Sequence, residues 1–256
     1  SENIHMRIEI VEKKLFQDLI KHEFDKNIEY VDSFCIDSRK IRKGDVFLPL
    51  KGNRVDSHLF IDNVIAKGAS LIFSENKIDK KNIINVNSTI DLLKSLSRKW
   101  FKKLNSSVIA ITGSNGKTTT KQMITRIFQN SYSVNHTQKN YNSTIGLPIC
   151  LFNFKKNCKV SIVEMGASSK GEIEYLCNII QPNYSLITNI HDAHIGNFKS
   201  IKELIDTKSQ IFKGTSKDGI IFENVDDINI SHLCKELKNK IRYGFKDSNV
   251  DFYGSM

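Results

Sequence analysis

A glycine-containing turn between an apolar strand and a helix constrains this sequence more than any other feature. Residues 108–112 are small or β-branched and predict a buried strand. Gly113 and Gly116 interrupt the pattern, and Lys117 to Asn130 resumes it with apolar residues at helical spacing. A strand, a glycine turn, Gly-Lys-Thr and a helix in this order are typical of a phosphate-binding loop. In such a loop, backbone N–H groups and the helix N-terminus face an anion.

The residues of the loop have separate predicted tasks. Lys117 can reach the terminal phosphates of a nucleotide, and the hydroxyl of Thr118 can hold Mg²⁺. The turn is shorter than the common form of the motif, because Ile111 and not Gly stands five residues before Gly116. An ordinary strand-to-helix turn is the alternative interpretation. The predicted cofactor-binding residues of the loop are Gly113, Ser114, Asn115, Gly116, Lys117, Thr118 and Thr119.

A carboxylate and two histidines follow other predicted strands. Glu164 ends the apolar strand 159–164, either as a carboxylate in solvent or as a Mg²⁺ ligand opposite Thr118. The phosphate loop upstream favours the second interpretation. His191 and His194 stand three residues apart, which is weak evidence for zinc. Because Mg²⁺ prefers oxygen, one histidine is better interpreted as a second-metal ligand or a phosphate contact, and His191 alone as an exposed loop residue.

Lys208 is unusual because it falls on the apolar face of the predicted helix 200–212. Its ammonium could reach water while its stem is buried. Alternatively, its charge is removed or recruited at the active site, since a lone buried ammonium is costly. The spacing leaves both open. The apolar residues that share this face are Ile201, Leu204, Ile205 and Ile211.

Length and composition predict a globular protein of two domains. The chain has 256 residues, of which 39% are hydrophobic and 26% charged. The longest apolar runs fall well short of the roughly 20 residues that span a membrane, and the N-terminus does not resemble a signal peptide, so we expect a cytoplasmic protein without membrane insertion. The net charge of +10 is spread along the chain, which favours a polyanionic small substrate over nucleic acid. Five scattered cysteines indicate neither a disulfide framework nor a zinc site, and Cys177 and Cys234, on apolar helix faces, are predicted to be buried thiols.

Alternating elements predict an α/β fold in both domains. The first domain, residues 6–105, has predicted helices near 15–20, 60–67 and 89–104 and strands near 33–36, 46–50 and 68–73. The second domain, residues 106–256, is predicted to hold a mostly parallel sheet flanked by helices. Its predicted strands are 108–112, 132–135, 159–164, 185–189, 219–223 and 240–245. Its predicted helices are 117–130, 171–180, 200–212 and one bearing Ile230, Leu233 and Leu237.

Motifs in order along nearly the whole chain resemble the Mur ligase family. The central motifs are residues 111–119 (ITGSNGKTT), 140–148 (NYNSTIGLP), 164–166 (EMG) with 171–173 (GEI), 188–190 (TNI) with 193–194 (AH), and Lys208. In the first domain, residues 37–39 (DSR), 44–47 (GDVF), 51–52 (KG) and 56–58 (DSH) resemble the uridine-nucleotide domain of the family. The first domain is therefore identified as similar to a UDP-precursor-binding domain and the second to an ATP-binding domain.

The resemblance implies an ATP-dependent ligase of bacterial peptidoglycan synthesis, expected to be a monomer. It implies that ATP phosphorylates the terminal carboxylate of UDP-MurNAc-tripeptide and that the amine of D-Ala-D-Ala attacks the acyl phosphate. The implied catalytic residues are Lys117, Lys208 and His194, and the implied Mg²⁺ ligands are Thr118, Glu164, His194 and a carbamylated Lys208. Asn224 matches an adenine contact, Asn140 and Asn142 match a substrate-facing loop, and Ser38 and Arg39 match the uridine-nucleotide site.

Some features depart from the family pattern or leave alternatives open. His191, Ser143 and Ser57 stand where the family usually has Gly, Asn and Gly. The family also has a C-terminal domain that closes over ATP, whereas this sequence ends at Met256, so we expect a fragment that does not complete ligation alone. The ligase that adds the third peptide residue, or one resembling folylpolyglutamate synthase, is the alternative within the family. A P-loop kinase or a non-catalytic nucleotide-binding module is the alternative outside it.

Overall fold

The chain forms two compact units, each built on its own sheet. The computed structural model describes residues 6–52, 55–191 and 198–255. Within these residues, the first unit comprises the chain up to Leu104 together with Pro148–Lys156, and the second comprises Asn105–Leu147 and the chain from Asn157 onward. The sequence places a boundary near residue 105, but it assigns 148–156 to the second domain, whereas this segment packs in the first unit.

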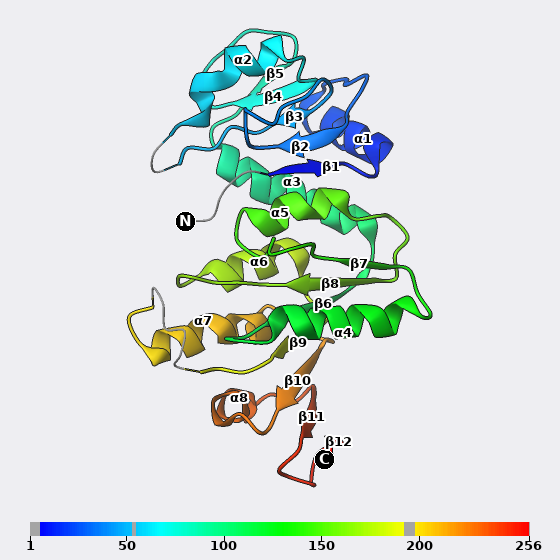
Figure 1. Ribbon diagram of the computed structural model, residues 1–256, viewed down its shortest axis with the longest axis vertical. Helices are drawn as coiled ribbons and strands as arrows, with labels where there is room; N and C mark the ends of the chain where they lie inside the picture. Colours follow the sequence, from blue (N-terminus) through cyan, green and yellow to red (C-terminus); the bar gives the residue numbers. More distant parts are fainter. Residues whose placement is uncertain (1–5, 53–54, 192–197, 256) are drawn as a thin grey trace. The chain divides into compact units, whose positions relative to one another are not determined.

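The first unit contains a five-stranded mixed sheet (Figure 1). Its strand order is β1-β2-β3-β4-β5, in which β1 pairs antiparallel with β2 and the remaining pairs are parallel. The strands are β1 (Arg7–Glu9), β2 (Ser33–Cys35), β3 (Val46–Phe47), β4 (Leu71–Ser74) and β5 (Ile83–Asn85). The helical elements are α1 (Lys13–Phe24), η1 (Ser57–Phe60), α2 (Ile61–Ala66), α3 (Thr89–Leu104) and η2 (Leu151–Asn153).

An aromatic cluster explains why residues 148–156 belong to the first unit. The ring of Phe152 stacks on Phe34 with centroids 4.5 Å apart and meets Phe16 edge-on at 5.6 Å. Trp100 of the amphipathic helix α3 lies 5.7 Å from Phe152, and its indole N–H donates to the carbonyl of Leu151 at 2.7 Å. The short segment 148–156 could bury little apolar surface by itself, whereas it buries the large ring of Phe152 among the other aromatic rings of the first unit.

The second unit contains a seven-stranded sheet in which every pair is parallel. Its order is β12-β11-β10-β9-β6-β8-β7, so β6 lies in the interior of the sheet between β8 and β9. The strands are β6 (Ser107–Thr112), β7 (Val134–His136), β8 (Val160–Glu164), β9 (Tyr184–Ile187), β10 (Ile220–Asn224), β11 (Lys240–Gly244) and β12 (Phe252–Tyr253). Parallel strands end at the same edge of a sheet, which brings the residues after β6, β8 and β9 together.

Helices connect these strands and cover the sheet. They are α4 (Lys117–Gln129), α6 (Glu172–Ile180), α7 (Ile201–Lys213) and α8 (Ile228–Cys234), whereas the short helix α5 (Gly146–Cys150) has its last three residues in the first unit. Ile124 and Phe128 of α4 pack on a cluster that includes Ile109, Ile111 and Ile162 of the neighbouring strands β6 and β8. Helices α6 and α7 pack against each other.

The predicted α/β class and the mostly parallel second sheet are confirmed. The sequence does not predict β1, β5, α5, η2 or β12, which are short and therefore give little periodicity. Helix α8 ends at Cys234, so Leu237 lies beyond the helix that was expected to carry it. All five cysteines are buried thiols outside any disulfide, as predicted for Cys177 and Cys234. Among the described residues, no helix is long and apolar enough to cross a membrane.

Candidate functional site

The glycine turn after β6 has a backbone that other residues could not easily adopt. Gly113 has a φ of +148°, and a Cβ added there would lie 1.9 Å from Oγ1 of Thr188. Gly116 has a φ of +77° and directly precedes α4. Both φ values lie in the region that favours glycine. The ammonium of Lys117 folds back over the turn and donates to the carbonyls of Gly113 at 2.8 Å and Ser114 at 3.1 Å.

Glu164 lies at the centre of a polar cluster at the carboxyl edge of the sheet. Its carboxylate accepts hydrogen bonds from the Thr118 hydroxyl at 3.0 and 3.1 Å and from the Asn142 amide at 2.8 Å. It also forms an ion pair with Lys121 at 3.1 Å, in which both side chains are almost fully buried. The backbone N–H of Glu164 donates to the Thr137 hydroxyl at 3.0 Å. Three side chains therefore fix the position of this carboxyl group, and Thr137 fixes the backbone that carries it.

Lys208 extends from α7 to the same turn. Its ammonium donates to the Gly113 carbonyl at 2.9 Å, and the residue is only 4% exposed, so the charge does not reach water. Burial and the nearby Lys117 lower the pKa of Lys208 to about 8. Burial also lowers the pKa of Lys117, and Glu164 partly offsets this effect. Two ammonium groups thus lie beside one glycine turn, an arrangement that suits a polyanion.

The segment after β9 forms hydrogen bonds with the turn. The Thr188 hydroxyl donates to the Asn115 carbonyl at 2.6 Å, and the Asn189 side chain accepts from the Asn115 N–H at 2.9 Å. Asn224, at the end of β10, donates to the Thr188 carbonyl at 3.1 Å. The turn is therefore preorganised by neighbouring strand ends.

The oxygen atoms of this cluster fit a hard divalent cation. The Thr118 hydroxyl and the Glu164 carboxylate lie within hydrogen-bond distance of each other, so one ion could contact both after a small movement. Among residues 6–52, 55–191 and 198–255, no group of three or more His, Cys, Asp and Glu side chains is placed to hold a metal. The hydroxyl and carboxylate oxygens of Thr118 and Glu164 suit Mg²⁺, completed by phosphate and water oxygens, better than they suit zinc, which prefers nitrogen and sulfur ligands.

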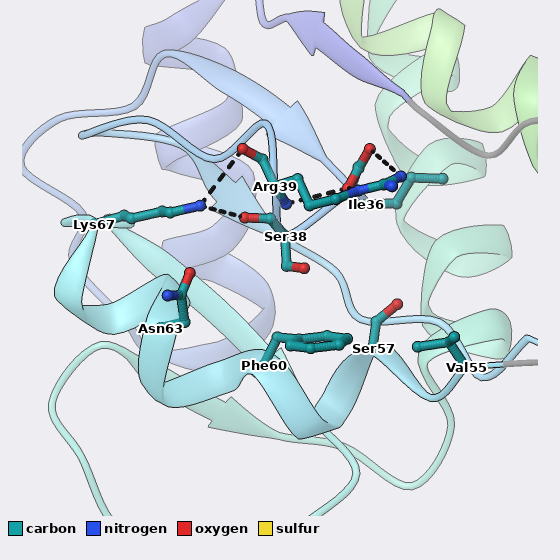
Figure 2. A pocket seen from close by; sticks show the side chains of 9 residues that line it. Ile36, Ser38, Arg39, Val55, Ser57, Phe60, Asn63 and Lys67 are labelled. Atoms are coloured by element: carbon teal, nitrogen blue, oxygen red, sulfur yellow. Dashed lines mark hydrogen bonds and ion pairs between the residues drawn. The ribbon is translucent and has the colours of Figure 1, made fainter.

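A second candidate site lies in the first unit, where Ser38 and Arg39 line a cavity of about 570 Å³ (Figure 2). The guanidinium of Arg39 donates to both carboxylate oxygens of the buried Asp37, at 2.9 and 3.0 Å. The ammonium of Lys67 donates to the backbone carbonyl of Ser38 at 2.9 Å and lies 3.4 Å from the backbone carbonyl of Arg39. Phe60 supplies an aromatic ring to the cavity. Two cations and a ring around one cavity suit a nucleotide.

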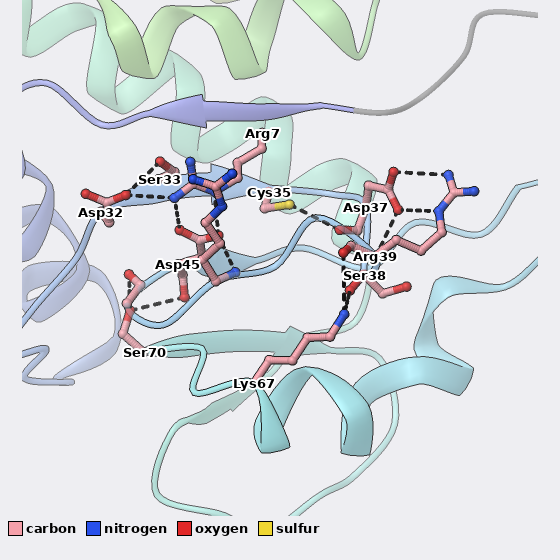
Figure 3. Close-up of polar contacts among 12 residues, drawn as sticks. Arg7, Asp32, Ser33, Cys35, Asp37, Ser38, Arg39, Asp45, Lys67 and Ser70 are labelled. Atoms are coloured by element: carbon pink, nitrogen blue, oxygen red, sulfur yellow. Dashed lines mark hydrogen bonds and ion pairs between the residues drawn. The ribbon is translucent and has the colours of Figure 1, made fainter.

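A separate ion-pair cluster supports the strands of the first unit (Figure 3). Arg7 of β1 donates to both carboxylate oxygens of the fully buried Asp45, at 2.8 and 2.9 Å, and to Asp32 at 2.7 Å. Asp45 also accepts the backbone N–H of Arg42 at 2.9 Å. These contacts tie β1 to the chain before β2 and β3, so we assign this cluster a structural task.

The structure brings most of the predicted residues of the second unit to one edge. The loop residues Gly113 to Thr119, Glu164, Asn142 and Lys208 lie there, with Asn224 one contact away through Thr188. Asn140 lines an adjacent groove. His194 lies outside the described residues. Lys121 is not among the predicted site residues, although its place four residues after Lys117 puts both on one helix face. Nothing local to the sequence signals Lys67 or Phe60.

Comparisons with known proteins agree with this arrangement. Residues 111–255 match the Mur ligase middle domain, and residues 31–100 match the Mur ligase family, catalytic domain. The UDP-N-acetylmuramoyl-tripeptide–D-alanyl-D-alanine ligase of Buchnera aphidicola subsp. Baizongia pistaciae is 37% identical over 229 residues, which cover 87% of this chain and 49% of that protein. The Bacillus subtilis ligase of the same name is 34% identical, over 75% of this chain and 43% of its own length.

Solved structures give the same result. The MurF ligase of Thermotoga maritima in complex with ADP has a TM-score of 0.78 and 33% identity, over 84% of this chain and 50% of that one. A MurF from Acinetobacter baumannii has a TM-score of 0.79 and 29% identity, over 94% and 54%. The chain thus spans about half the length of the relatives it matches. Since the middle-domain match alone covers more than half of the sequence, the chain belongs to the Mur ligase family.

Proposed function

We propose that this chain is the nucleotide- and precursor-binding part of an ATP-dependent ligase that joins D-Ala-D-Ala to UDP-MurNAc-tripeptide. The observation that carries the proposal is the convergence of Lys117, Thr118, Glu164 and Lys208 on one turn. The names of the relatives support the choice of this reaction within the family. ATP and a UDP-linked precursor are cytoplasmic compounds, so the proposal places the protein in the bacterial cytoplasm.

The turn from Gly113 to Thr119 would hold the phosphates of ATP. Lys117 already lies over the turn, and its bonds to the Gly113 and Ser114 carbonyls would be exchanged for bonds to phosphate oxygens. Its burial strengthens any such ion pair, because the local dielectric is low. The ADP complex of the Thermotoga protein supports nucleotide binding at this fold. Asn224 would lie toward the adenine, as its family position implies.

Thr118 and Glu164 would hold Mg²⁺, with His194 and Lys208 at a second position. When bound, Mg²⁺ neutralises charge on the transferring phosphoryl group. Asn142 and Lys121 hold the Glu164 carboxylate in a fixed position, which would limit its reorganisation when an ion binds. Thr118 would turn its hydroxyl oxygen from Glu164 toward the ion.

Lys208 would act after carbamylation. Its neutral amine attacks CO₂, a nitrogen–carbon bond forms and one proton is released, which converts a cation into an anionic oxygen ligand. Only the neutral amine reacts, and the pKa of about 8 that burial and Lys117 impose makes this form accessible near neutral pH. An unmodified ammonium in this place would repel a cation.

Separate residues would bind the precursor. Ser38 and Arg39 line the cavity of the first unit and would contact the uridine nucleotide, with Arg39 oriented by Asp37. Asn140 and Asn142 belong to the loop after β7 and would face the precursor near the phosphates. Asn142 also bonds to Glu164, so this loop is coupled to the predicted Mg²⁺ ligand.

Calorimetric titration of the chain with UDP-MurNAc-tripeptide tests the proposal, with UDP-MurNAc-dipeptide and folate as controls. We expect saturable binding of the tripeptide form and much weaker binding of both controls. Preferred binding of the dipeptide form would assign the chain to the preceding ligase of the family. Binding of ATP by a chain that binds no muramoyl peptide would overturn the proposed precursor recognition.

The carbamate has a direct spectroscopic test. With ¹³C-bicarbonate, the wild-type chain should show a carbamate carbon resonance that Lys208→Met lacks and that the exposed-site control Lys202→Met retains. A spectrum without this resonance at pH 8 to 9 would remove Lys208 from the proposed ligand set.

A further inference from the structure

A polar groove of about 500 Å³ runs along α4 in the second unit, and the functions proposed above leave most of it without a task. Helix α4 contributes six residues, from Thr118 to Gln129, at spacings of three and four. The other lining residues are His136, the last residue of β7, and the four residues that follow it, up to Asn140. Eleven residues of rise along the helix make the helical side of the groove about 16 Å long.

The groove has a strongly cationic lining. Lys121, Arg126 and Lys139 line it together with His136, and none of the described lining residues is Asp or Glu. The guanidinium of Arg126 has no hydrogen bond or ion pair with any residue of the described ranges. The ammonium of Lys139 lies over the Tyr141 ring at 5.7 Å, which keeps this cation at the wall. A ligand with carboxylates would therefore find donors already in place.

One end of the groove opens beside the reaction site. Thr118 both lines the groove and bonds to Glu164, and Lys121 pairs with Glu164 while donating to the Lys139 carbonyl at 3.3 Å. A substrate carboxylate that reacts at the phosphate loop must approach this end. The remainder of the groove is lined largely by carboxamides, such as Gln122 and Gln129, which can bond to peptide groups. Three extended residues span about 10 Å, which fits within the groove.

We infer that this groove receives the acidic peptide of the acyl substrate, and that Arg126 pairs with a peptide carboxylate other than the one that reacts. This inference rests on the proposed function and assigns a position to one part of its substrate. Arg126 lies eight residues, about 12 Å along the helix, from Thr118. Arg126 therefore contacts the peptide at a distance from the reacting carboxylate. It determines which peptide is bound and takes no part in the reaction.

The test compares calorimetric titrations of UDP-MurNAc-tripeptide and of UDP-MurNAc, which lacks the peptide. Loss of a charge-assisted hydrogen bond in a half-open groove should raise the Kd of Arg126→Ala for the tripeptide form roughly tenfold. The Kd for UDP-MurNAc should not change. Arg126→Lys should restore part of the affinity, because it keeps the charge. Lys235→Ala, which removes an exposed cation after α8, is the matched control and should bind both ligands like the wild type.

The outcomes separate the groove from the proposed function. If wild type and Arg126→Ala bind the tripeptide form equally well, or if Arg126→Ala weakens both ligands equally, the groove assignment is wrong and precursor recognition stands. Equal affinity of the wild type for the two ligands would also overturn the groove, because the peptide would then add no contact. A wild-type chain that binds neither ligand would overturn precursor recognition, and the groove assignment with it. Circular dichroism of each variant confirms the fold, since Arg126 is exposed.

Discussion

Lys121 and Glu164 form an ion pair at 3.1 Å in which the side chains are only 4% and 3% exposed. Removing one partner of such a buried ion pair destabilises the fold, because the other charge is then buried without an opposite charge beside it. The Thr118 hydroxyl and the Asn142 amide complete the hydrogen bonding of the carboxylate. The charge of Lys121 thus stabilises the buried carboxylate of Glu164, which the proposed function requires as a Mg²⁺ ligand.

Lys121→Met should therefore destabilise the chain by about 3–5 kcal/mol, as measured by denaturant unfolding. The control is Lys14→Met, which breaks the exposed pair with Asp18 and should cost less than about 1 kcal/mol. Lys121→Arg should fall between the two, since it keeps the charge in a changed shape. Equal losses for Lys121→Met and Lys14→Met would show that burial adds nothing to this pair.

The two glycines of the phosphate loop should differ in their sensitivity to alanine. Both have positive φ, but only the Cβ of Gly113→Ala would collide, at 1.9 Å from Oγ1 of Thr188, whereas nothing lies within 4 Å of the Cβ of Gly116→Ala. Gly116→Ala should cost about 1–2 kcal/mol from backbone strain alone. Gly113→Ala should cost more and should also weaken ATP binding, which thermal unfolding with and without nucleotide would measure. A smaller loss for Gly113→Ala than for Gly116→Ala would contradict this geometry.

Lys208 should make stability depend on pH above neutrality. Its pKa is about 8 in the fold, against an ordinary value of 10.5, because of burial and Lys117. Between these two values the unfolded chain binds a proton that the folded chain does not, so the free energy of unfolding rises with pH. The rise amounts to about 3 kcal/mol at most.

Lys208→Met lacks this titration, so the wild type should gain stability relative to the variant between pH 7.5 and 10.5. Urea unfolding at several pH values measures this difference in stability, from which the titration of groups far from residue 208 cancels. Lys202→Met, an exposed change on the same helix, should keep a constant difference from the wild type. A constant difference for Lys208→Met as well would mean that its pKa is ordinary in the fold.

Phe152 should be essential to the first unit although its neighbours in sequence lead into the second. Phe152→Ala removes ring contacts to Phe16, Phe34 and Trp100 and should cost about 3–5 kcal/mol. The fluorescence of Trp100, the single tryptophan, reports unfolding of this unit. Leu59→Ala, at a residue that is 79% exposed, should stay within about 0.5 kcal/mol of the wild type.

Local sequence patterns were sufficient to predict part of the fold and of the candidate site. Residues close together in the sequence encode β6, the glycine turn and α4. The positions of Lys117 and Thr118 at the start of the helix could therefore be predicted from the sequence. Glu164 could be placed because it ends an apolar strand, and parallel strands end at one edge. Helix α8 was predicted too long, because Leu237 continues the apolar spacing after the helix has ended at Cys234.

Tertiary structure decided what depends on distant partners. The sequence puts Lys208 on an apolar face but cannot say whether its ammonium reaches water, whereas the fold directs it to Gly113, 95 residues away in the chain. Lys121 became part of the site only because β8 brings Glu164 beside α4. Residues 148–156 joined the first unit because an aromatic core accepts Phe152 there. Backbone propensity and periodicity act over a few residues and can be read from the sequence, whereas the partner of a buried charge or ring depends on which surfaces the whole chain packs together.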